Sequence, residues 1–318
     1  MRYNDGKFYQ EIFCVMLADI LHSNLPDITA HKNMPLSSFC TLGTGGEAEI
    51  FAAPDTIEDV SRLLGFAARE GCPVYILGGG SNVLFPDGLV KGIVLSTQNL
   101  NAIEWRTPVT ADVDAGFRLP SLMKAVRERG LGGLEFAAGI PGTIGGAIAG
   151  NAGAGGHGVC ELLEEVITVE ADGAVRTWPH NEIAYSYRNC SLSEGKRVIV
   201  SARMTFRTSH PKDEEVLQSY LLRRGTQPHG LRNAGCTFKN PEGASAGRLL
   251  DECGCKGLSV GGAVVSDVHA NFILNNGHAT SSDVTELVKI CAKRVYDSTG
   301  IKLEPEIKIL DPCFRIQW

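Results

Sequence analysis

Two glycine-rich segments of this sequence have the composition of phosphate-binding backbone. The apolar run 74–77 leads into Gly-Gly-Gly-Ser-Asn at positions 78–82, and residues 134–151 contain many glycines and alanines with almost no charge. Glycine lacks a Cβ atom and reaches positive φ, so its backbone can lie close to a ligand. Consecutive amides in such loops form nests that bind anions. Two such segments predict a large cofactor that carries phosphates, such as a dinucleotide.

Both segments contribute candidate cofactor-binding residues. A single glycine is most often a turn residue, but a triple glycine after a predicted strand, together with a second similar segment, favours a ligand site. We expect segment 134–151 to supply close-lying backbone and not to fill a core by bulk. The candidates are Gly78, Gly79, Gly80, Ser81, Asn82, Gly139, Pro141, Gly142, Gly145, Gly146 and Asn151.

A dinucleotide fold of the Rossmann type is the first alternative. Gly153–Gly158 fits G-x-G-x-x-G, and Gly43–Ala48 fits its relaxed form. The first match follows no β-branched strand, and the second leads into a predicted strand where the fingerprint requires a helix. The sequence contains no G-x-x-x-x-G-K-[ST] motif, which excludes a P-loop. The context therefore argues against both nucleotide-binding motifs.

The composition is typical of a soluble globular protein with two or three domains. The 318 residues are 43% hydrophobic and 21% charged, and the formal net charge is −6. The sequence has no dense run of Lys or Arg of the kind that binds nucleic acid. It also has no apolar stretch long enough to cross a bilayer. We therefore expect neither a nucleic-acid partner nor a membrane partner, and a monomer.

The N-terminal region and the cysteines bear on the cellular compartment. Residues 8–23 predict an amphipathic helix packed on the body, because no basic segment precedes them and no small-residue cleavage site follows. The ten cysteines form no C-x-x-C pair, and the closest spacing is Cys253-Gly-Cys255. We expect reduced thiols, a cytoplasmic location and no metal site.

A predicted β-α-β unit positions the first glycine segment. Glu47–Ala53 alternates with period two, as a strand does. Thr56–Gly71 has helical spacing, a threonine cap and a terminal glycine. Val74–Leu77 predicts a buried strand that runs into the glycines, and Gly92–Ser96 predicts a further strand.

The second glycine segment lies within a predicted series of strands around one helix, and the remainder of the chain is predicted to be α+β. The expected strands are Thr110–Gly116, Glu165–Ala171, Ala174–Trp178 and Arg197–Phe206, and the expected helices are Leu119–Arg129, Ser245–Cys253 and Ser282–Tyr296.

Seven motifs, taken together, resemble the UDP-N-acetylenolpyruvoylglucosamine reductase (UDP-N-acetylmuramate dehydrogenase) family, in its shorter-loop branch. They occur in the family's order between residue 37 and about residue 310. The motifs are Ser38–Gly46, Leu77–Phe85, Gly139–Gly146, Tyr185–Arg188, Arg224–Pro228, Gly235–Pro241 and Leu303–Glu306.

The resemblance implies an α+β fold with a two-subdomain FAD-binding part of the vanillyl-alcohol-oxidase type and a smaller C-terminal α+β substrate-binding domain. The implied boundaries are 1–36 for a helical lead-in, 37–98 and 99–208 for the two FAD-binding subdomains, and 209–318 for the C-terminal domain. Ser81 stands where covalent flavoproteins of this superfamily often carry a histidine, which implies non-covalent FAD.

The resemblance also implies the reaction. NADPH reduces FAD, and the flavin then reduces UDP-N-acetylglucosamine enolpyruvate to UDP-N-acetylmuramate in peptidoglycan precursor synthesis. A hydride from flavin N5 reaches the methylene carbon and leaves negative charge next to a carboxylate. Such a site needs a cation at that charge and an acid that protonates the adjacent carbon.

Three catalytic roles follow from the resemblance. Arg188 would stabilise the charge, because its planar guanidinium suits a carboxylate and stays protonated. Cys236 stands where many family members carry a proton-donating serine, and a thiol with an ordinary pKa near ~8.5 is mostly protonated at neutral pH. Glu306 would hold the enolpyruvyl end or help to reprotonate the donor.

The implied substrate contacts lie near these three residues in sequence. Longer-loop relatives carry a lysine where Gln227 stands, and the short connection 188–198 has no room for the tyrosine-bearing segment that closes over the substrate in that branch. The candidates are Tyr187, Gln227, Lys239 and Asn240.

Three other functions compete with this interpretation. The first is a flavin-dependent oxidase on the same FAD-binding fold with another substrate. The second is a non-catalytic relative that keeps FAD as a structural or sensing ligand. The third is a cysteine-nucleophile hydrolase, which is weakened because no motif places a histidine to activate Cys236.

Overall fold

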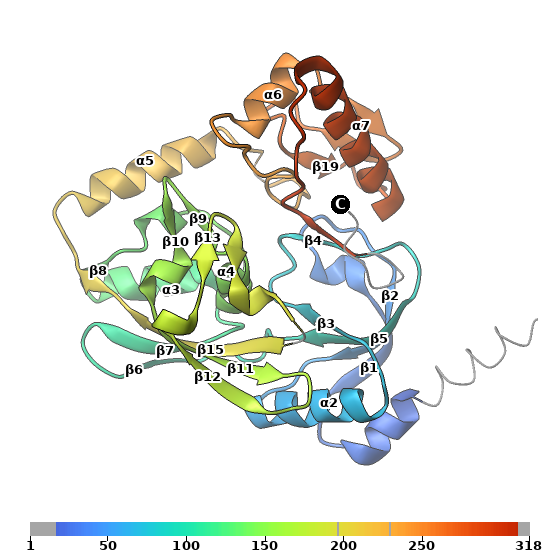
Figure 1. Cartoon of the computed structure of the whole chain (residues 1–318), viewed down its shortest axis with the longest axis vertical. Coiled ribbons are helices and arrows are strands. Elements are labelled where there is room, and N and C mark those ends of the chain that lie inside the picture. The colour runs from blue at the N-terminus through green and yellow to red at the C-terminus, as the bar shows by residue number, and fades with distance from the viewer. Residues whose placement is uncertain (1–16, 196, 229, 311–318) are drawn as a thin grey trace, which may run out of the picture.

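The computed structural model describes residues 17–310 with the exception of 196 and 229. Two main sheets form the lower part of the molecule in Figure 1, and a smaller unit built on helices α6 and α7 lies above the first sheet. The predicted helix over 8–23 is helical at residues 17–24, where Leu17 and Leu21 are buried, and its remainder lies outside the described residues. No described helix has the length and apolarity that a bilayer crossing requires.

The first sheet has the strand order β1-β2-β5-β3. Strand β2 and strand β3 both pair with β5 in parallel, and β1 pairs with β2 antiparallel. The predicted β-α-β unit is confirmed, because helix α2 follows β2 and precedes β3. The expected burial of β3 is wrong, because Ile76 is 48% exposed and only Leu77 is buried, as β3 lies at the edge of the sheet. The bounds are β1 Ala30–Pro35, β2 Glu47–Ala52, α2 Ile57–Arg69, β3 Val74–Leu77 and β5 Val90–Ser96.

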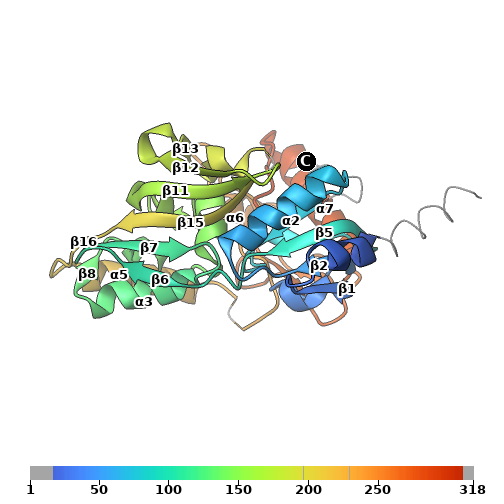
Figure 2. The ribbon, with the colours of Figure 1, turned by 90° about the horizontal axis from the view of Figure 1, so that it is seen from below.

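Helix α2 lies between the two sheets (Figure 2). It begins at Thr56, whose side chain accepts a hydrogen bond from the Asp59 amide, as the sequence predicts for a cap. Its apolar face buries Leu63 and Phe66 in one cluster with residues of both sheets, among them Ile93 and Val200. Burial of each such side chain contributes about 1.5–3 kcal/mol, so this helix joins the two sheets firmly.

The second sheet is antiparallel, with the order β12-β11-β15-β7-β6. All four strands predicted in this region and the helix before Gly130 are confirmed, and β6 is an additional edge strand. The bounds are β6 Ile103–Trp105, β7 Thr110–Asp114, α3 Leu119–Glu128, β11 Leu163–Glu170, β12 Val175–Pro179 and β15 Arg197–Thr205.

The second glycine segment differs in one respect from its prediction. Residues Ile144–Ala149 form the short helix α4, and Ile144 and Ile148 are fully buried in the core beneath the second sheet. The segment therefore does fill core volume with its isoleucines. Its small residues let the backbone of α4 lie close to neighbouring segments. At Gly145, for example, a Cβ would lie only 2.9 Å from the Ala115 Cβ.

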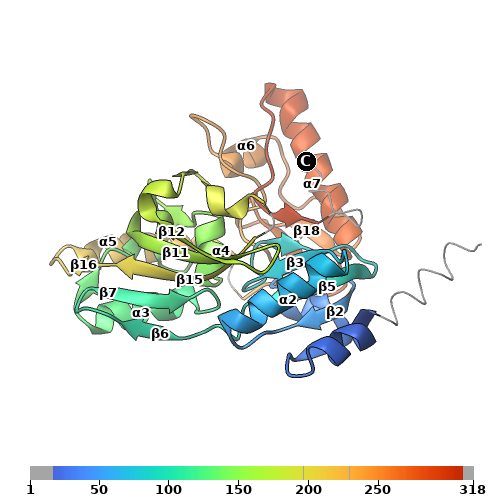
Figure 3. The ribbon, with the colours of Figure 1, turned by 60° about the horizontal axis from the view of Figure 1, so that its bottom comes forward.

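The C-terminal unit follows helix α5, which the sequence analysis did not predict and which crosses the second-sheet region towards this unit (Figure 1). Figure 3 shows α7, the longest helix, beside the small sheet that contains β18. Both predicted helices, α6 and α7, are confirmed. The bounds are α5 Asp213–Gly225, α6 Ala246–Glu252, β17 Ser259–Val260, β18 Ala263–Val265, β19 Ile273–Asn275, α7 Ser281–Thr299 and β20 Lys308–Ile309.

Short elements complete the described chain. The two-residue strands are β4 Val83–Leu84, β8 Leu131–Gly132, β9 Gly153–Ala154, β10 His157–Gly158, β13 Tyr185–Ser186, β14 Asn189–Cys190 and β16 Arg207–Thr208. The 3-10 helices are η1 Leu36–Phe39, η2 Glu135–Ala137, η3 Val159–Leu162, η4 His180–Glu182 and η5 Ser191–Ser193.

Polar contacts attach the C-terminal unit to the first-sheet region. The Asp87 carboxylate accepts hydrogen bonds from the Ser281 and Ser282 amides, at 2.6 and 2.8 Å, at the start of α7. The Asn275 side chain donates to the Leu42 carbonyl at 2.9 Å. Strand β20 pairs in parallel with β4, directly after the first glycine loop. The C-terminal strand is therefore placed next to the glycine loop that the sequence singled out.

Candidate functional site

The two glycine loops lie against each other. A Cβ at Gly79 would be 2.8 Å from the Gly142 Cα, and a Cβ at Gly78 would be 2.7 Å from the Thr143 Oγ1. Contacts this short exclude any side chain at Gly79, because the obstacle is backbone. The sequence predicted that two backbone cradles bind one cofactor, and the structure places the two loops in contact, as this prediction requires.

This site has the donors that a diphosphate requires. The amides of residues 79–82 donate no hydrogen bond to any other residue that the structure describes. The Thr143 hydroxyl, which is buried, has no partner among those residues either. Buried polar groups are rarely left unpaired in native proteins, so the unpartnered buried hydroxyl of Thr143 beside this loop indicates a ligand. The residues present fit the diphosphate of FAD.

Asn82 joins the cofactor loop to the C-terminal strand. Its Nδ2 donates to the Glu306 carbonyl at 3.1 Å, and its own carbonyl accepts from the Lys308 amide at 3.1 Å. The sequence placed Asn82 among the cofactor-binding residues. In the structure its side chain contacts the segment that carries a predicted catalytic residue.

Asn151 and Gly139 also have partners within the protein. The Asn151 side chain donates to the Ser186 carbonyl at 2.9 Å and accepts from the Cys160 amide at 3.1 Å. It therefore connects the end of the second glycine segment to the β13–β14 hairpin. The Gly139 carbonyl accepts a hydrogen bond from Arg224.

Arg188 and Glu306 form an ion pair although they come from distant segments. The Arg188 Nε donates to the Glu306 Oε1 at 2.5 Å, and the two side chains are 23% and 17% exposed. Arg188 lies in the turn between β13 and β14 with a φ of +56°, a conformation that non-glycine residues rarely adopt. Strain of this kind persists where the surroundings enforce it and is common at functional sites.

Burial and the arginine act on Glu306 in opposite directions. Burial raises the pKa of the Glu306 carboxyl, and the nearby Arg188 charge lowers it. Burial has the larger effect, so the pKa lies above the ordinary value. This carboxyl can therefore exchange a proton more readily near neutral pH than a solvated glutamate.

Cys236 lies within the electrostatic reach of both residues. Burial, and to a smaller extent the Glu306 charge, raise the pKa of the Cys236 thiol, while Arg188 and Arg224 lower it, and the net pKa is about 11. A thiol with that pKa is fully protonated at neutral pH, which is the state a proton donor needs. The sequence left open whether an electropositive site would ionise this cysteine. The raised pKa favours the protonated thiol.

The backbone around Cys236 runs beside the segment of Glu306. The Glu306 amide donates to the Thr237 carbonyl at 2.8 Å, and the Lys239 amide donates to the Glu304 carbonyl at 2.8 Å. These ladder bonds fix the thiol-bearing segment to the carboxylate-bearing segment. All three predicted catalytic residues are therefore brought to one place.

Three of the four candidate substrate contacts surround this place. The Tyr187 hydroxyl accepts from the Asn240 amide at 3.4 Å, and the tyrosine is 53% exposed at the tip of its hairpin. Lys239 pairs with Glu304 at 2.6 Å. The Asn240 side chain accepts from the Ala246 amide at 3.0 Å, so part of its capacity is used within the loop.

Arg224 is a residue at this site that the sequence analysis did not single out. It donates from Nη1 to the Gln227 Oε1 at 2.5 Å and also contacts Gly139, and its charge acts on Cys236. Burial lowers the pKa of its guanidinium. The sequence signal was its place in the motif Arg224–Pro228, where only Gln227 was considered. Gln227 thus lies with Arg224 and the second glycine loop.

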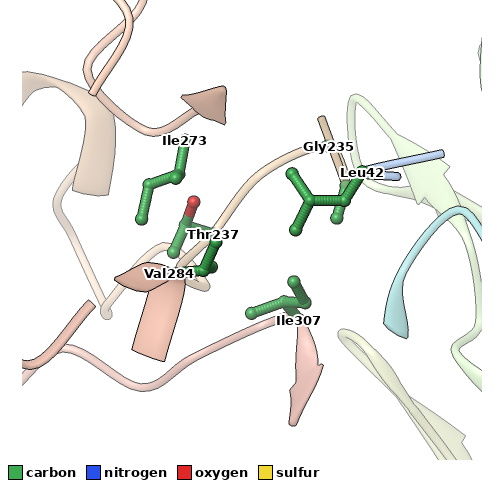
Figure 4. A pocket seen from close by; sticks show the side chains of 7 residues that line it. Leu42, Gly235, Thr237, Ile273, Val284 and Ile307 are labelled. Atoms are coloured by element: carbon green, nitrogen blue, oxygen red, sulfur yellow. The ribbon is translucent and has the colours of Figure 1, made fainter. Parts of the chain in front are cut away.

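A small cavity lies in the C-terminal core near the thiol. Its volume is about 10 Å³. Figure 4 shows the side chains of Leu42, Ile273, Val284 and Ile307 around it, with Thr237 at one wall. It is too small and too apolar for a substrate. Among the described residues there is also no cluster of three side chains that could bind a metal ion.

Comparison with known families agrees with this geometry. A family model described as an FAD binding domain matches residues 48–178. A second model, described as the C-terminal domain of UDP-N-acetylenolpyruvoylglucosamine reductase, matches residues 227–310. The predicted FAD-binding part and the smaller C-terminal α+β domain are thereby confirmed.

Individual relatives extend the match over most of the chain. The UDP-N-acetylenolpyruvoylglucosamine reductase of Prochlorococcus marinus is 39% identical over 284 residues, which cover 88% of this chain and 98% of the relative. That of Moorella thermoacetica is 41% identical over 282 residues, or 87% and 92% of the two chains. The crystal structure of the Thermus caldophilus enzyme superimposes with a TM-score of 0.74 at 34% identity, covering 89% of this chain and 98% of the other. The chain therefore belongs to the UDP-N-acetylenolpyruvoylglucosamine reductase family of FAD-dependent oxidoreductases.

Proposed function

We propose that this protein reduces the enol ether of UDP-N-acetylglucosamine enolpyruvate to UDP-N-acetylmuramate, with NADPH as the source of electrons, in peptidoglycan precursor synthesis. One observation carries the proposal: Arg188, Cys236 and Glu306 converge from three segments of a chain of this family. The relatives carry the name of this reductase. We place the enzyme in the cytoplasm as a monomer, with domains at 37–98, 99–208 and 209–318 after a lead-in.

The two glycine loops would hold FAD without a covalent bond. The amides of residues 79–82 and the Thr143 hydroxyl would bind its diphosphate, and Gly139, Pro141 and Gly142 would pass beside it. Gly145, Gly146 and Asn151 would support that loop from α4 and its end. When bound, the flavin accepts a hydride from NADPH and gives one to the methylene carbon of the substrate.

Arg188 would bind the substrate carboxylate. Hydride addition places negative charge on the carbon next to that carboxylate, and a guanidinium in a partly buried site stabilises the charge more strongly than water does. The ion pair with Glu306 keeps the guanidinium in position before the substrate arrives. The positive φ of Arg188 is then the conformational cost of directing this side chain into the site.

Cys236 would protonate that same carbon. Its Sγ proton moves to the carbon, and the thiolate that results is stabilised by the arginine charges around it. Glu306 would take up a proton from solvent and pass it to the sulfur, a role favoured because burial raises the pKa of its carboxyl. Tyr187, Lys239 and Asn240 would contact the enolpyruvyl sugar, and Gln227 would contact the nucleotide side through its position beside Arg224.

Spectroscopy of the purified protein without oxygen tests this proposal. NADPH should bleach the yellow absorbance of the bound flavin, and the enolpyruvyl sugar nucleotide should restore it in a single turnover. An oxidase on the same fold would behave differently, because an alcohol or a sugar would bleach the flavin and NADPH would not. Failure of the sugar nucleotide to reoxidise the NADPH-reduced enzyme would reject the proposed substrate.

A further inference from the structure

We propose that Asn271 is a positioning residue that holds the proton donor Cys236 in register with Glu306. The expected effect on catalysis rests on the proposed function, whereas the expected effect on the position of Cys236 rests on geometry alone. Asn271 is 3% exposed and lies just before strand β19. It belongs to none of the motifs that the sequence analysis connected with the reaction.

Asn271 forms three hydrogen bonds with the two residues that follow Cys236. Its Oδ1 accepts from the Phe238 amide at 2.9 Å, and its Nδ2 donates to the Phe238 carbonyl at 2.8 Å. Its main-chain carbonyl accepts from the Thr237 amide at 2.8 Å. A side-chain amide bonded to both polar groups of one residue reproduces the pairing that a neighbouring strand would supply.

The opposite edge of the same segment is bonded to the extended segment 304–306, which contains Glu306. Thr237 accepts from the Glu306 amide at 2.8 Å, and Phe238 forms an isolated bridge with Pro305. The thiol-bearing segment thus has Asn271 on one edge and residues 304–306 on the other. Bonds on both edges restrain the segment that carries Cys236. The position of Cys236 relative to Glu306 therefore depends on Asn271 as well as on residues 304–306.

Asn271 is itself firmly held. Its amide donates to the His269 Nδ1 at 3.2 Å, and the next strand begins two residues later. Both functional atoms of the side chain are used on Phe238, so rotation of the side-chain amide would break two bonds at once. Both polar atoms of this buried side chain are hydrogen-bonded to Phe238. The side chain therefore fixes the position of the Phe238 backbone in addition to stabilising the fold.

A general folding role is the alternative, and Asn275 provides the matched control. Asn275 is 8% exposed, donates to the Leu42 carbonyl at 2.9 Å and accepts from the Gly277 amide at 2.8 Å. It is a buried asparagine in the same unit with a similar set of bonds. None of these bonds involves the segment 236–239. Loss of either side chain removes comparable hydrogen bonding, but only one loss should affect the thiol.

The decisive measurement is the pH dependence of Cys236 alkylation by iodoacetamide, followed peptide by peptide with mass spectrometry. The groups that act on this thiol are Glu306, Arg188, Arg224 and Arg223. In the parent protein burial holds the thiol pKa at about 11. In Asn271→Ser and Asn271→Ala the segment loosens and water reaches the sulfur. The pH midpoint of Cys236 alkylation should then fall by at least one unit. At pH 8 this shift makes alkylation about tenfold faster, because about tenfold more of the thiol is ionised.

The two half-reactions of the holoenzyme give the second readout. Reduction of the bound flavin by NADPH should stay within about twofold of the parent, and reoxidation by the enolpyruvyl sugar nucleotide should slow by roughly 10- to 100-fold, because a displaced donor loses its alignment. If the proposed substrate is wrong, this readout disappears while the alkylation result persists. The two failures are therefore distinguishable.

The outcomes divide plainly. The proposal is supported if Cys236 in Asn271→Ser is alkylated faster and with a lower pH midpoint than in the parent, while the profile of Asn275→Ser matches that of the parent. A Cys236 profile unchanged by Asn271→Ser, or shifted equally by Asn275→Ser, overturns it. Asn271→Ser keeps a polar group at this position, so it provides the test if Asn271→Ala fails to fold.

Discussion

Arg188 donates its Nε–H to the Glu306 Oε1 at 2.5 Å, which joins the β13–β14 hairpin, inserted between β12 and β15, to the segment just before β20. The pair is partly buried and stands beside a neutral thiol. A cation, a carboxyl group and an acid therefore meet at one place before any substrate binds. Each of these groups can be removed separately, and the reaction divides into two half-reactions that report on them.

Substitution of the arginine should affect the second half-reaction. Arg188→Ala removes the charge that stabilises the developing carbanion, so flavin reoxidation by the sugar nucleotide should slow by about 10²–10³-fold, with flavin reduction by NADPH nearly unchanged. Stopped-flow absorbance measures both steps. Arg188→Lys keeps the charge but lacks the planar guanidinium, so its reoxidation rate should lie between those of the parent and Arg188→Ala. An unchanged reoxidation rate in Arg188→Ala would remove this residue from the mechanism.

Substitution of the thiol should separate proton donation from hydride chemistry. Cys236→Ser keeps a group that can donate a proton and should retain considerable turnover. Cys236→Ala should lose about 10²–10⁴-fold in the second half-reaction. Flavin reduction by NADPH should survive in both variants. Equal turnover of Cys236→Ala and the parent would show that another acid protonates the product.

The pH dependence of the second half-reaction should follow the buried thiol. Burial raises the pKa of Cys236 to about 11. The donor is active when protonated, so the rate should stay level on the alkaline side through pH 9 and decline only as pH approaches 11. Rates of single-turnover reoxidation between pH 7 and 11 test this. A midpoint near 9 would mean that the thiol is solvated in the working enzyme.

The contact between the glycine loops should make Gly79 essential for flavin binding. In Gly79→Ala the new Cβ would lie 2.8 Å from the Gly142 backbone, so the loops must separate. The purified variant should contain less than a tenth of the parent's FAD per protein. Gly88→Ala is the matched control, since a Cβ there meets nothing within 4 Å. A yellow, fully loaded Gly79→Ala protein would refute the proposed cofactor site.

The hydrogen bonds that Asp87 accepts from the first-turn amides of α7, next to the N-cap Thr280, should stabilise the attachment of the C-terminal unit. Burial raises the pKa of Asp87, but its bonds to Ser281 and Ser282 outweigh burial and lower it. The ionised form therefore stabilises the fold at pH values above 3.8, and this contribution is lost as pH falls through the lowered pKa.

Asp87→Ala should accordingly cost about 1 kcal/mol in free energy of unfolding at pH 7, the usual effect of losing a helix cap. Urea unfolding of parent and variant should give a difference that shrinks towards pH 3. Asp87→Asn, which keeps an acceptor, should cost less. A difference independent of pH would show that the charge of Asp87 is unimportant.

The local elements were predictable because their signals are local. Helix α2 has a threonine cap and a terminal glycine, and α7 ends before Gly300, which has a φ of +72°. Strand β3 is a short apolar run directly before glycines. Helix α5 was not predicted because its sequence is largely polar and it buries only Leu217. A helix without an apolar face gives no periodic signal.

The sequence indicated which residues form the site, but not which contacts hold them together. Motifs pointed to Arg188, Cys236 and Glu306, but nothing in the sequence shows that Asn82 bonds to the Glu306 carbonyl. Arg224 lies in the motif Arg224–Pro228, but its contacts with Gln227 and with Gly139 in the second glycine loop cannot be read from that motif. Contacts between distant segments arise from the packing of whole units, which the spacing of residues along a chain does not encode.

The bond between Asn82 and Glu306 spans 224 positions of the chain. During translation the flavin-binding region leaves the ribosome long before the strand that completes the catalytic centre, and domains tend to fold as they emerge. A nascent chain can therefore capture its cofactor while it is still chemically incompetent. The proposed catalytic centre would be complete only after Glu306 has been synthesised, so a chain that stops before this residue would bind flavin without reducing the proposed sugar nucleotide.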